Sequence, residues 1–412
     1  MATAVALQRA GYTSVLLLER RTRDECLSGG TALGLWTNAF RALDGLGPDM
    51  ADRVRAVSSR TTEVEICRQT NDRVLTKFDL RSCAGGPHEF GGVLRGKLVE
   101  VLYEAVDPGR VEVQFGVDVA VVDVDTDPDL VRVTMCDGAT YVGSLVVGAD
   151  GVRSVVARTY GRASGKDMST NDAGQIAIRG IAAFDARERV VDGGPIRQVL
   201  GAGVRAGMYP VGQGRNELYW YVCYPTGTGV EGSDMLEEAK RVLLESSGDW
   251  ETSCIFDAIG RTSTTRVSRN RLADRWDVDS VFLSDGEAGA SIALVGDALH
   301  PMTPNLGQGG CCALEDAVLL AAYLPGPDVK GEAVRRAITG YTKKRAKRCV
   351  KLTVRARLMG EILQSGFLPL VLARDWFLEN LFQAGGFLDH AGYDVREDAR
   401  ARSTRTDSSS RN

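Results

Sequence analysis

One stretch of the sequence, ALVGDALHPMTPNLGQGGCCALEDA at residues 293–317, constrains the fold more than any other. An apolar run typical of a buried strand ends at Asp297, and a proline-bracketed loop then leads to a glycine-rich turn that opens a long helix. Asp297 is thereby expected at the carboxyl end of a strand, where it can hydrogen-bond sugar-like hydroxyls. The helix N-terminus would offer free N–H groups and the positive end of its dipole to negative charge. A purely structural turn needs no such combination, so we expect a ligand site that includes Asp297, Gly307, Gly309 and Gly310.

The first twenty residues have the pattern of the second half of a nucleotide-binding βαβ unit. MATAVALQRAG predicts a helix over residues 1–10, and SVLLLE (14–19) is a continuous apolar run, as in a strand buried on both faces of a parallel sheet. In such a unit a glycine-rich turn lies between the first strand and the helix. An acidic residue at the end of the second strand, about twenty residues after the first glycine of that turn, accepts hydrogen bonds from an adenosine ribose. Counting back from Glu19 would place that turn just before Met1. The alternative is that Glu19 is simply an exposed carboxylate.

A third signal is LVVGADGVRS at residues 145–154, where an apolar strand leads to Asp150, a glycine and an arginine-bearing helix start. The glycine allows the backbone to approach a bulky ligand, and the carboxylate can hold a hydroxyl or a water near a pyrophosphate. A strand followed by an Asp-Gly turn is also a common structural element, so an ordinary turn is the alternative here.

Composition excludes several classes of function. The net charge of -4 over 412 residues argues against nucleic acid as the main partner, which normally requires a basic surface. The nine cysteines contain no C-x-x-C pair, which indicates reduced thiols in an intracellular protein. The three histidines, His88, His300 and His390, are far apart in sequence, so we expect no metal site.

The sequence predicts no transmembrane segment, because no apolar run approaches the roughly twenty residues needed to span a bilayer. The most apolar candidate, FLPLVLA at 367–373, is expected to be the buried start of a helix rather than an anchor. The expected location is intracellular, with the cytoplasm favoured and plastid targeting left open.

The organisation of the chain predicts an α/β fold, α+β overall, in which one domain interrupts another. Asn38 can cap a short helix, and the strands VEVQF, VAVVDV, LVRVTM and YVGSLVVGAD form a β-meander that a plain dehydrogenase domain lacks. The expected parts are a Rossmann-like ligand-binding domain at 1–62, 91–174 and 290–350; substrate-domain strands at 63–90 with the rest of that sheet-containing domain at 175–289; C-terminal helices at 351–394; and a disordered polar tail at 395–412.

Three motifs in this order, LLLER, GADGVRS and GDALHPMTPNLGQGGCCALEDA, resemble the signatures of the class A FAD-dependent monooxygenases. Within that family the chain looks closest to plant monooxygenases related to zeaxanthin epoxidase and to salicylate hydroxylases. The resemblance covers roughly residues 1–350 and implies one FAD bound in an extended pose.

The resemblance also implies roles for individual residues. Glu19, with Arg20 beside it, would hold the adenosine ribose, Arg95 would lie along the FAD chain, and Asp150 would be linked to both FAD and the nicotinamide. Asp297 would bind the ribityl chain. The backbone of Gly307, Gly309 and Gly310 would face the N1–C2 carbonyl edge of the flavin, and GGTALG (29–34) would pass near the ring.

The activity implied is hydroxylation or epoxidation of a small aromatic or alkene-containing substrate, with dioxygen and with NADPH or NADH as co-substrate. This chemistry needs no protein nucleophile, so no catalytic residue is predicted. His300 is expected to pack the loop, and Cys311 and Cys312 to be buried as small apolar residues. At most half of the cluster Tyr219, Trp220, Tyr221 and Tyr224 can line one pocket, because strand side chains alternate between faces.

Two other functions fit the same motifs: a flavin-dependent reductase or dehydrogenase, and a non-catalytic homologue. The second arises because the glycine-rich turn and the strand before it are expected ahead of Met1. Backbone N–H donors for the pyrophosphate would then be missing, and two strands would lose a neighbour. On this basis we expect the 412 residues alone to bind FAD poorly and to fold less stably than their relatives.

Overall fold

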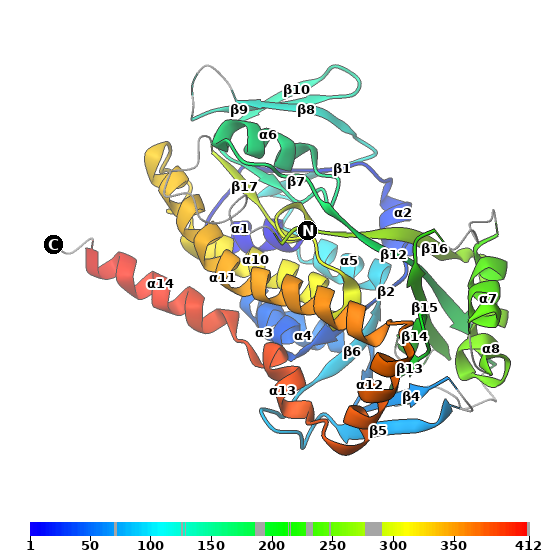
Figure 1. Ribbon diagram of the computed structural model, residues 1–412. Coiled ribbons are helices and arrows are strands. Elements are labelled where there is room, and N and C mark those ends of the chain that lie inside the picture. The colour runs from blue at the N-terminus through cyan, green and yellow to red at the C-terminus, as the bar shows by residue number, and fades with distance from the viewer. Residues whose placement is uncertain are drawn as a thin grey trace.

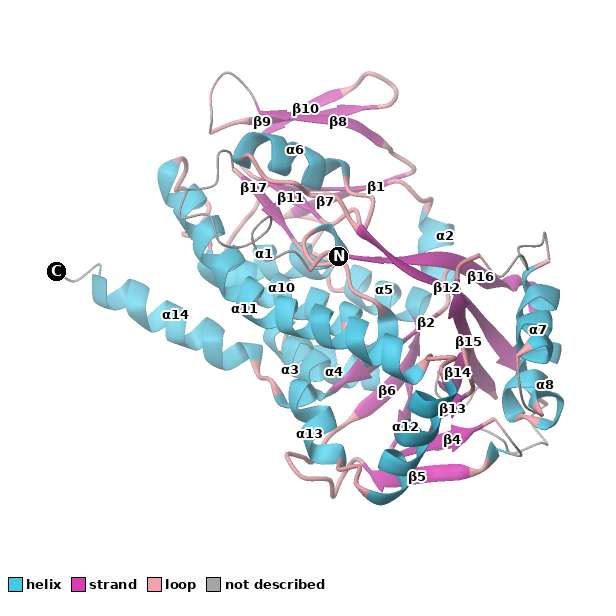
Figure 2. Ribbon diagram, in the orientation of Figure 1, coloured by secondary structure: helices cyan, strands magenta, loops and turns pink. Residues whose placement is uncertain are grey.

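The computed structural model describes residues 1–69, 72–124, 127, 129–185, 194–212, 214, 216–227, 234–246, 249–276 and 291–409. These residues form several sheets flanked by helices, so the mixed α/β class predicted from the sequence is confirmed (Figures 1 and 2). The domain boundary expected at residues 289–290 lies in the stretch 277–290, outside the described residues.

Two pairs of parallel strands carry the acidic residues singled out in the sequence. The strands are β1 (Val15–Glu19) beside β7 (Val111–Phe115), and β11 (Val146–Gly148) beside β17 (Ile292–Leu294). Glu19 ends β1, Asp150 follows β11 and Asp297 follows β17. Because Gly148 pairs with Leu294, the ends of β11 and β17 lie side by side. All three carboxylates therefore lie at or just beyond the carboxyl ends of parallel strands, where α/β folds bind ligands.

Two small antiparallel sheets accompany these strands. One has the order β2-β6-β3 and comprises β2 (Ala32–Trp36), β6 (Phe90–Leu94) and β3 (Ser58–Thr61). The other is the expected meander, with the order β10-β9-β8 and the strands β8 (Val119–Val124), β9 (Val131–Met135) and β10 (Thr140–Gly143). VEVQF, expected in the meander, instead forms β7 and pairs with β1, so that assignment was wrong.

A seven-stranded sheet forms the other half of the molecule, to the right in Figure 1. Its order is β16 (Thr262–Asp274), β12 (Asn171–Ala183), β15 (Glu217–Pro225), β14 (Arg205–Pro210), β13 (Ile196–Leu200), β4 (Glu63–Arg68) and β5 (Val74–Asp79). The strands of residues 63–79 therefore join those of 171–274 in one sheet. One face packs against α7 (Met235–Glu245) and α8 (Cys254–Gly260) in a core that includes Trp220, Tyr224 and Trp250. The opposite face packs in part against β2 and β6.

The main core lies where helices pack around the parallel strands. Helix α10 (Gly309–Tyr323) is central, with α1 (Ala2–Arg9), α3 (Thr37–Leu46) and the long α11 (Glu332–Leu363) against it. Other helices are α2 (Arg23–Ser28), α4 (Met50–Arg55), α5 (Arg95–Glu104), α6 (Val155–Ser164), α12 (Leu368–Asn380), α13 (Ala384–Leu388) and α14 (Val395–Ser409), with 3₁₀ turns at Trp250–Thr252, Gly296–Ala298, Pro304–Leu306 and Asp389–Gly392.

Several local expectations from the sequence were wrong. The five residues of β1 are half-buried rather than enclosed on both faces, since β1 is paired only with β7 among the described strands. Residues 395–409, expected to be a disordered tail, form α14, whose first residue Val395 is fully buried; residues 410–412 are outside the described part. FLPLVLA does begin a helix, α12, but most of its side chains are exposed.

Candidate functional site

The loop between β17 and α10 exposes one side to solvent. Asp297 and Gly307 are exposed, and Gly309 and Gly310 form the first turn of α10. Gly307 has φ +62°, and a Cβ built there would lie 3.1 Å from Trp36 Nε1, so backbone and space both favour glycine. A Cβ at Gly309 would lie 3.7 Å from Asp297 Oδ1. The structure therefore brings Asp297 and the glycines of 307–310 together, as the sequence predicted.

Asp297 combines solvent exposure with an unfavourable environment for its charge. Surrounding protein desolvates the carboxyl and raises its pKa, an effect that the charges of His300 and Arg179 only partly offset. The side chain makes no hydrogen bond to any residue that the structure describes. Because it is open to solvent on one side and makes no such bond, this carboxyl is free to accept hydrogen bonds from a ligand.

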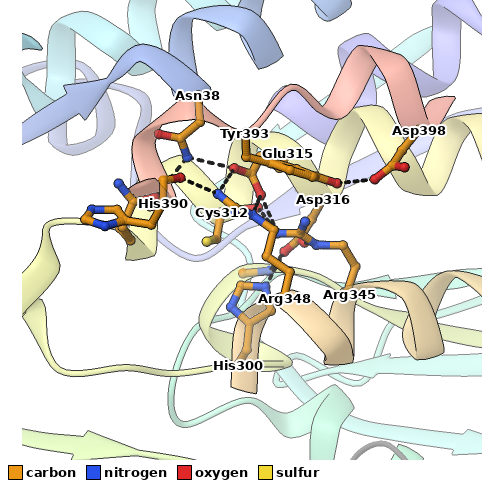
Figure 3. Close-up of polar contacts among 12 residues, drawn as sticks. Asn38, His300, Cys312, Glu315, Asp316, Arg345, Arg348, His390, Tyr393 and Asp398 are labelled. Carbon is orange, nitrogen blue, oxygen red and sulfur yellow. Dashed lines mark hydrogen bonds and ion pairs between the residues drawn. The ribbon is translucent and has the colours of Figure 1, made fainter. Parts of the chain in front are cut away.

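The other side of the same loop is held by Asp316 of α10 (Figure 3). Asp316 Oδ2 accepts hydrogen bonds from the Gly296 backbone N–H at 2.6 Å and from His300 Nε2 at 2.7 Å. Its Oδ1 accepts from Arg345 Nε of α11 at 2.5 Å. Burial opposes ionisation of Asp316, but His300 and Arg345 outweigh it and lower its pKa to about 2. The expected packing role of His300 is confirmed by this buried contact.

The preceding residue, Glu315, positions the end of the loop next to α10, because Asn38 hydrogen-bonds both Glu315 and Gln308. Asn38 Nδ2 donates to Glu315 Oε1 at 2.7 Å and to Gln308 Oε1 at 2.9 Å, and Gln308 immediately precedes α10. Arg348 makes two hydrogen bonds of 2.8 Å to Glu315, and Arg345 adds a second ion pair at 2.9 Å. Asn38, expected to cap a helix, lies inside α3 without a capping bond and instead links α3 to the first half of α10, so that prediction was wrong.

We call Asn38, His300, Glu315, Asp316, Arg345 and Arg348 the loop clamp. Its two carboxylates face two guanidinium groups and one imidazole, so the buried charges are paired. His300, Asp316 and Cys349 also have possible metal-ligand atoms within 4.8 Å of one another, but Arg345 already contacts this carboxylate. Sequence reasoning missed the clamp apart from His300. The ED pair that ends the glycine-rich motif, followed by arginines three residues apart in α11, was the only available signal.

Cys311 and Cys312 are fully buried beside the clamp, as expected. Burial raises the pKa of the Cys311 thiol, which disfavours a reactive thiolate. The Cys311 thiol points toward the Gly34 carbonyl, at a sulfur–oxygen distance of 3.8 Å. Both cysteines therefore act as small packing residues under the first turn of α10.

The other predicted cluster is at the end of β1. Glu19 accepts a hydrogen bond from the Arg21 backbone N–H at 2.9 Å, and Arg20 is exposed. Arg95, at the start of α5, lies close enough to Glu19 for the two charges to interact. Burial and the charge of Arg21 lower the pKa of Arg95, and Glu19 opposes this shift. Arg95 Nη1 is buried without a hydrogen-bond partner among the described residues. An unsatisfied buried guanidinium N–H is costly unless a ligand accepts from it.

Asp150 differs from the expectation for its side chain. Its carboxylate accepts from the Ser154 hydroxyl and from the backbone N–H groups of Val155, at 2.7 Å, and Val156, at 3.3 Å. It therefore caps the N-terminus of α6 and is already occupied by neighbours in the sequence. The adjacent Gly151, with φ +80°, leaves the backbone of this turn open on the outside.

Strand β2 connects the two clusters. A Cβ at Gly30, just before β2, would lie 2.9 Å from Arg95 Cδ, while Leu33 lies 3.7 Å from the Cβ position of Gly310. The segment GGTALG thus runs from the Glu19–Arg95 end to the glycine turn of α10. Its path defines an extended site in which one end is near Arg95 and the other is near Asp297.

The face of the seven-stranded sheet that lies opposite α7 and α8 turns toward this second end. A series of ring contacts starts at Trp36 beside Gly307 and continues through Phe90, Tyr209, Tyr219 and Tyr221, with successive centroids 5.0, 5.2, 4.7 and 6.2 Å apart. Tyr219 and Tyr221 share this face, whereas Trp220 and Tyr224 belong to the α7–α8 core. The expected division of the aromatic cluster is therefore confirmed.

Two arginines on the same sheet face have no buried acidic partner among the residues that the structure describes. Arg179 of β12 contacts the Tyr219 hydroxyl and interacts with the charge of Asp297, and its Nε has no hydrogen-bond partner among the described residues. Arg205 is fully buried, stacks over Tyr221 at 5.4 Å, and donates to Asn305 in the glycine-rich loop. Sequence reasoning missed both, because nothing in the local sequence places them opposite Asp297.

Comparison with known proteins identifies the family. Residues 1–356 match a family described as an FAD binding domain. Aurachin C monooxygenase/isomerase of Stigmatella aurantiaca is 31% identical over 337 residues, which cover 80% of this chain and 81% of that protein. Monooxygenase 2 of Arabidopsis thaliana is 28% identical over 396 residues, covering 92% and 91% of the two chains.

Among solved structures, Klebsiella pneumoniae HpxO complexed with FAD and uric acid has a similar fold, with a TM-score of 0.76 at 21% identity. The alignment covers 96% of this chain and 93% of that one. The family resemblance noted in the sequence is thus confirmed by a family match over most of the chain and by named relatives. This chain belongs to the family of FAD-dependent, class A flavin monooxygenases.

Proposed function

We propose that this monooxygenase inserts one oxygen atom of dioxygen into a small, electron-rich aromatic acceptor, with NADPH or NADH as the electron donor. The proposal rests on two surfaces of the molecule that face each other. Asp297 and the exposed N-terminus of α10 lie on one side, and the tyrosine and arginine face of the seven-stranded sheet lies on the other. This geometry supports an aromatic acceptor over an isolated alkene, because planar rings stack well on aromatic side chains.

The residues fit an extended FAD. Arg95 Nη1 and Gln308 Nε2 are buried donors without partners among the described residues, and Asp297 is an acceptor without a bond. We assign Glu19, with Arg20, to the adenosine ribose, Arg95 to the chain beyond it, and Asp297 to the ribityl hydroxyls. The Asp150–Gly151 turn would contribute through its backbone, since the Asp150 carboxylate is bound to α6. Gly307, Gly309 and Gly310 would face the flavin ring.

Bound FAD supplies the redox chemistry and the activation of dioxygen. The chain supplies position and charge. The N–H groups and dipole of α10 would stabilise negative charge at the edge of the ring, because they point at it and need no reorganisation. The loop clamp fixes the position of these N–H groups through hydrogen bonds on the buried side of the loop. The tyrosines would exclude water from the acceptor, which protects an oxidising site from side reactions.

Arg179 and Arg205 favour an acceptor that carries negative charge or a strongly polarised oxygen. The ordered residues around them offer tyrosines and Asn305 rather than a buried carboxylate, and Asp297 acts on Arg179 only through its charge. A phenolate, enolate or ring carboxylate could accept their hydrogen bonds. HpxO, with the similar fold, was solved with uric acid, which is a planar polar heterocycle.

We also infer an intracellular location, as expected from the sequence. All nine cysteines are free thiols in the structure, including the exposed Cys136. Unpaired thiols are typical of proteins kept in a reducing compartment.

The test is whether flavin reduction is coupled to ring oxygenation. Because the 412 residues are expected to bind FAD poorly, the test uses excess FAD. Under these conditions the purified chain should show the absorbance spectrum of bound flavin and should oxidise NADPH or NADH faster when a suitable phenolic or heteroaromatic acid is added. Mass spectrometry under ¹⁸O₂ should find one labelled oxygen in the product. Arg179→Met should raise the acceptor KM at least about tenfold, while Arg158→Met, on the exposed side of α6, should not. Nicotinamide oxidation without labelled product from any acceptor would instead indicate a reductase.

A further inference from the structure

Helix α12 has an inverted distribution of polarity. From Gly366 to Phe377, every exposed side chain is apolar, and the two charged side chains of the segment, Arg374 and Asp375, are each only 5% exposed. The exposed large side chains are Phe367 (68%), Leu368 (63%), Leu370 (39%), Leu372 (54%), Trp376 (58%) and Phe377 (47%), and we call this set the α12 face. A helix that packs on a core normally shows the reverse pattern.

The buried side of α12 is firmly held, so the outward direction of the α12 face is built into the fold. Arg374 Nη1 donates to the Leu363 carbonyl at 2.8 Å and to the Gly201 carbonyl at 3.3 Å. Asp375 pairs with Arg374 and, at 2.8 Å, with Arg68 of β4. Leu378 packs into a small core with residues of β4, β5 and β13. Turning the helix to bury its apolar side would break this buried ion-paired cluster, at a high cost.

We propose that the α12 face binds the surface of a phospholipid bilayer, with the helix lying parallel to the membrane plane. Leucines, phenylalanines and a tryptophan on one side of a helix are the composition of an interfacial helix, because aromatic rings settle at the headgroup level. Among the described residues, none of the helices is long and apolar enough to span a bilayer. The contact is therefore peripheral, and it lies beside β5 at the edge of the seven-stranded sheet (Figure 1).

A lipid surface fits the α12 face better than a second copy of the chain. The exposed parts of the six side chains of the α12 face together amount to on the order of 600 Å² of accessible surface. Each partner in a stable protein interface contributes about 800 Å² and roughly one hydrogen bond per 100–200 Å². None of these six side chains is charged, and only the Trp376 indole can donate a hydrogen bond. Lipid tails require no hydrogen bonds, so the absence of polar groups costs nothing there.

The proposal is tested with the FAD-loaded protein and large unilamellar vesicles of phosphatidylcholine. The protein is expected to co-sediment with the vesicles, and its tryptophan emission should shift to the blue because Trp376 leaves water. The shift should disappear in Trp376→Phe. Since the α12 face carries no charge, sedimentation should persist at high salt and should need no anionic lipid.

Variants distinguish this contact from nonspecific adhesion. Leu372→Glu places a charge in the middle of the α12 face and should lower partitioning at least about tenfold, because the variant loses the burial of an apolar side chain and would have to bring a charge to the membrane. Phe367→Ser is a second variant on the same face. Leu244→Glu, at a 51% exposed leucine of α7, is the matched control and should bind vesicles like the parent. Flavin content verifies that each variant is folded.

Three results would overturn the proposal. One is no sedimentation of the parent protein with phosphatidylcholine vesicles. Another is sedimentation that Leu372→Glu and Phe367→Ser leave unchanged. The third is a stable dimer in light scattering that Leu372→Glu dissociates, because a second copy of the chain would then cover the α12 face.

Discussion

The two sides of the segment from Gly296 to Asp316 satisfy their polar groups in opposite ways. On the inner side, Glu315 and Asp316 are fully buried and their charges are neutralised by two arginines and a histidine. On the outer side, Asp297 is exposed, desolvated and without a hydrogen bond, and Gly307 has no side chain at all. Polar groups that have no partner on the outer side can therefore keep fixed positions, because buried hydrogen bonds and ion pairs on the inner side hold the same stretch of backbone.

The two buried histidines near this segment show the same contrast on a smaller scale. His300 faces Asp316, and although burial opposes its charge, the ion pair raises its pKa. His390 is packed against Trp36 and Phe387, and neither ring nitrogen has a hydrogen-bond partner among the described residues. Burial lowers the pKa of His390 to about 4, although Asp389 Oδ1 lies 3.7 Å from Nδ1. The buried imidazole is thus favoured in its charged form where a buried carboxylate accepts its hydrogen bond, and in its neutral form where none does.

Breaking the inner side should have the largest effect on stability. Asp316→Ala leaves Arg345 and His300 without their shared partner, and removal of one member of a buried ion pair costs about 3–5 kcal/mol. Urea denaturation followed by circular dichroism measures the loss. Glu361→Ala, which removes an exposed partner of Arg357 on α11, should cost less than about 1 kcal/mol. Equal losses for the two variants would mean that the clamp is no more than a surface contact.

The histidine contrast predicts an acid-sensitive stability. His390 has a lowered pKa in the folded state, so the unfolded chain binds more protons, and stability falls as the pH drops from about 6.5 to about 4, by roughly 3 kcal/mol. His390→Phe should remove this part of the decline. The contribution of Asp316 should remain in both proteins, because it is present above the unfolded pKa and is lost only as the pH falls toward about 2. Unfolding measured across this pH range would contradict the assignment if both curves fell together above pH 4.

Breaking the outer side should affect FAD rather than the fold. Asp297→Asn removes a carboxylate whose pKa is raised by burial, so the stability of the apoprotein should stay the same or rise. Its affinity for FAD should fall roughly tenfold or more, since a hydrogen bond to a charged acceptor is worth about 1.5–3 kcal/mol. Fluorescence titration with FAD measures this. Asp137→Asn, in the turn between β9 and β10, serves as the control. An unfolded Asp297→Asn protein would show that the two sides of the loop are not separable.

Much of the site could be predicted because its signals are local in sequence. Asp297 follows a buried strand and Gly309 begins a helix, and such positions are set by the strand and the helix themselves. Asp150 shows the limit of this reasoning: a carboxylate after a strand was expected to face a ligand, but the next helix supplied nearer N–H donors. Asn38 shows the converse, since a residue expected to cap its own helix meets Gln308, which lies 270 positions away.

The sequence by itself determined the α/β class, the order of the motifs and the location of the glycine-rich helix start, because each depends on residues only a few positions apart. Only the tertiary structure decided which groups are paired. The arginines that neutralise Glu315 and Asp316 come from another helix, Arg179 reaches Asp297 from another sheet, and Arg374 and Asp375 turn inward to leave the α12 face outside. Burial and charge pairing are sums over neighbours from distant parts of the chain, and no local pattern contains them.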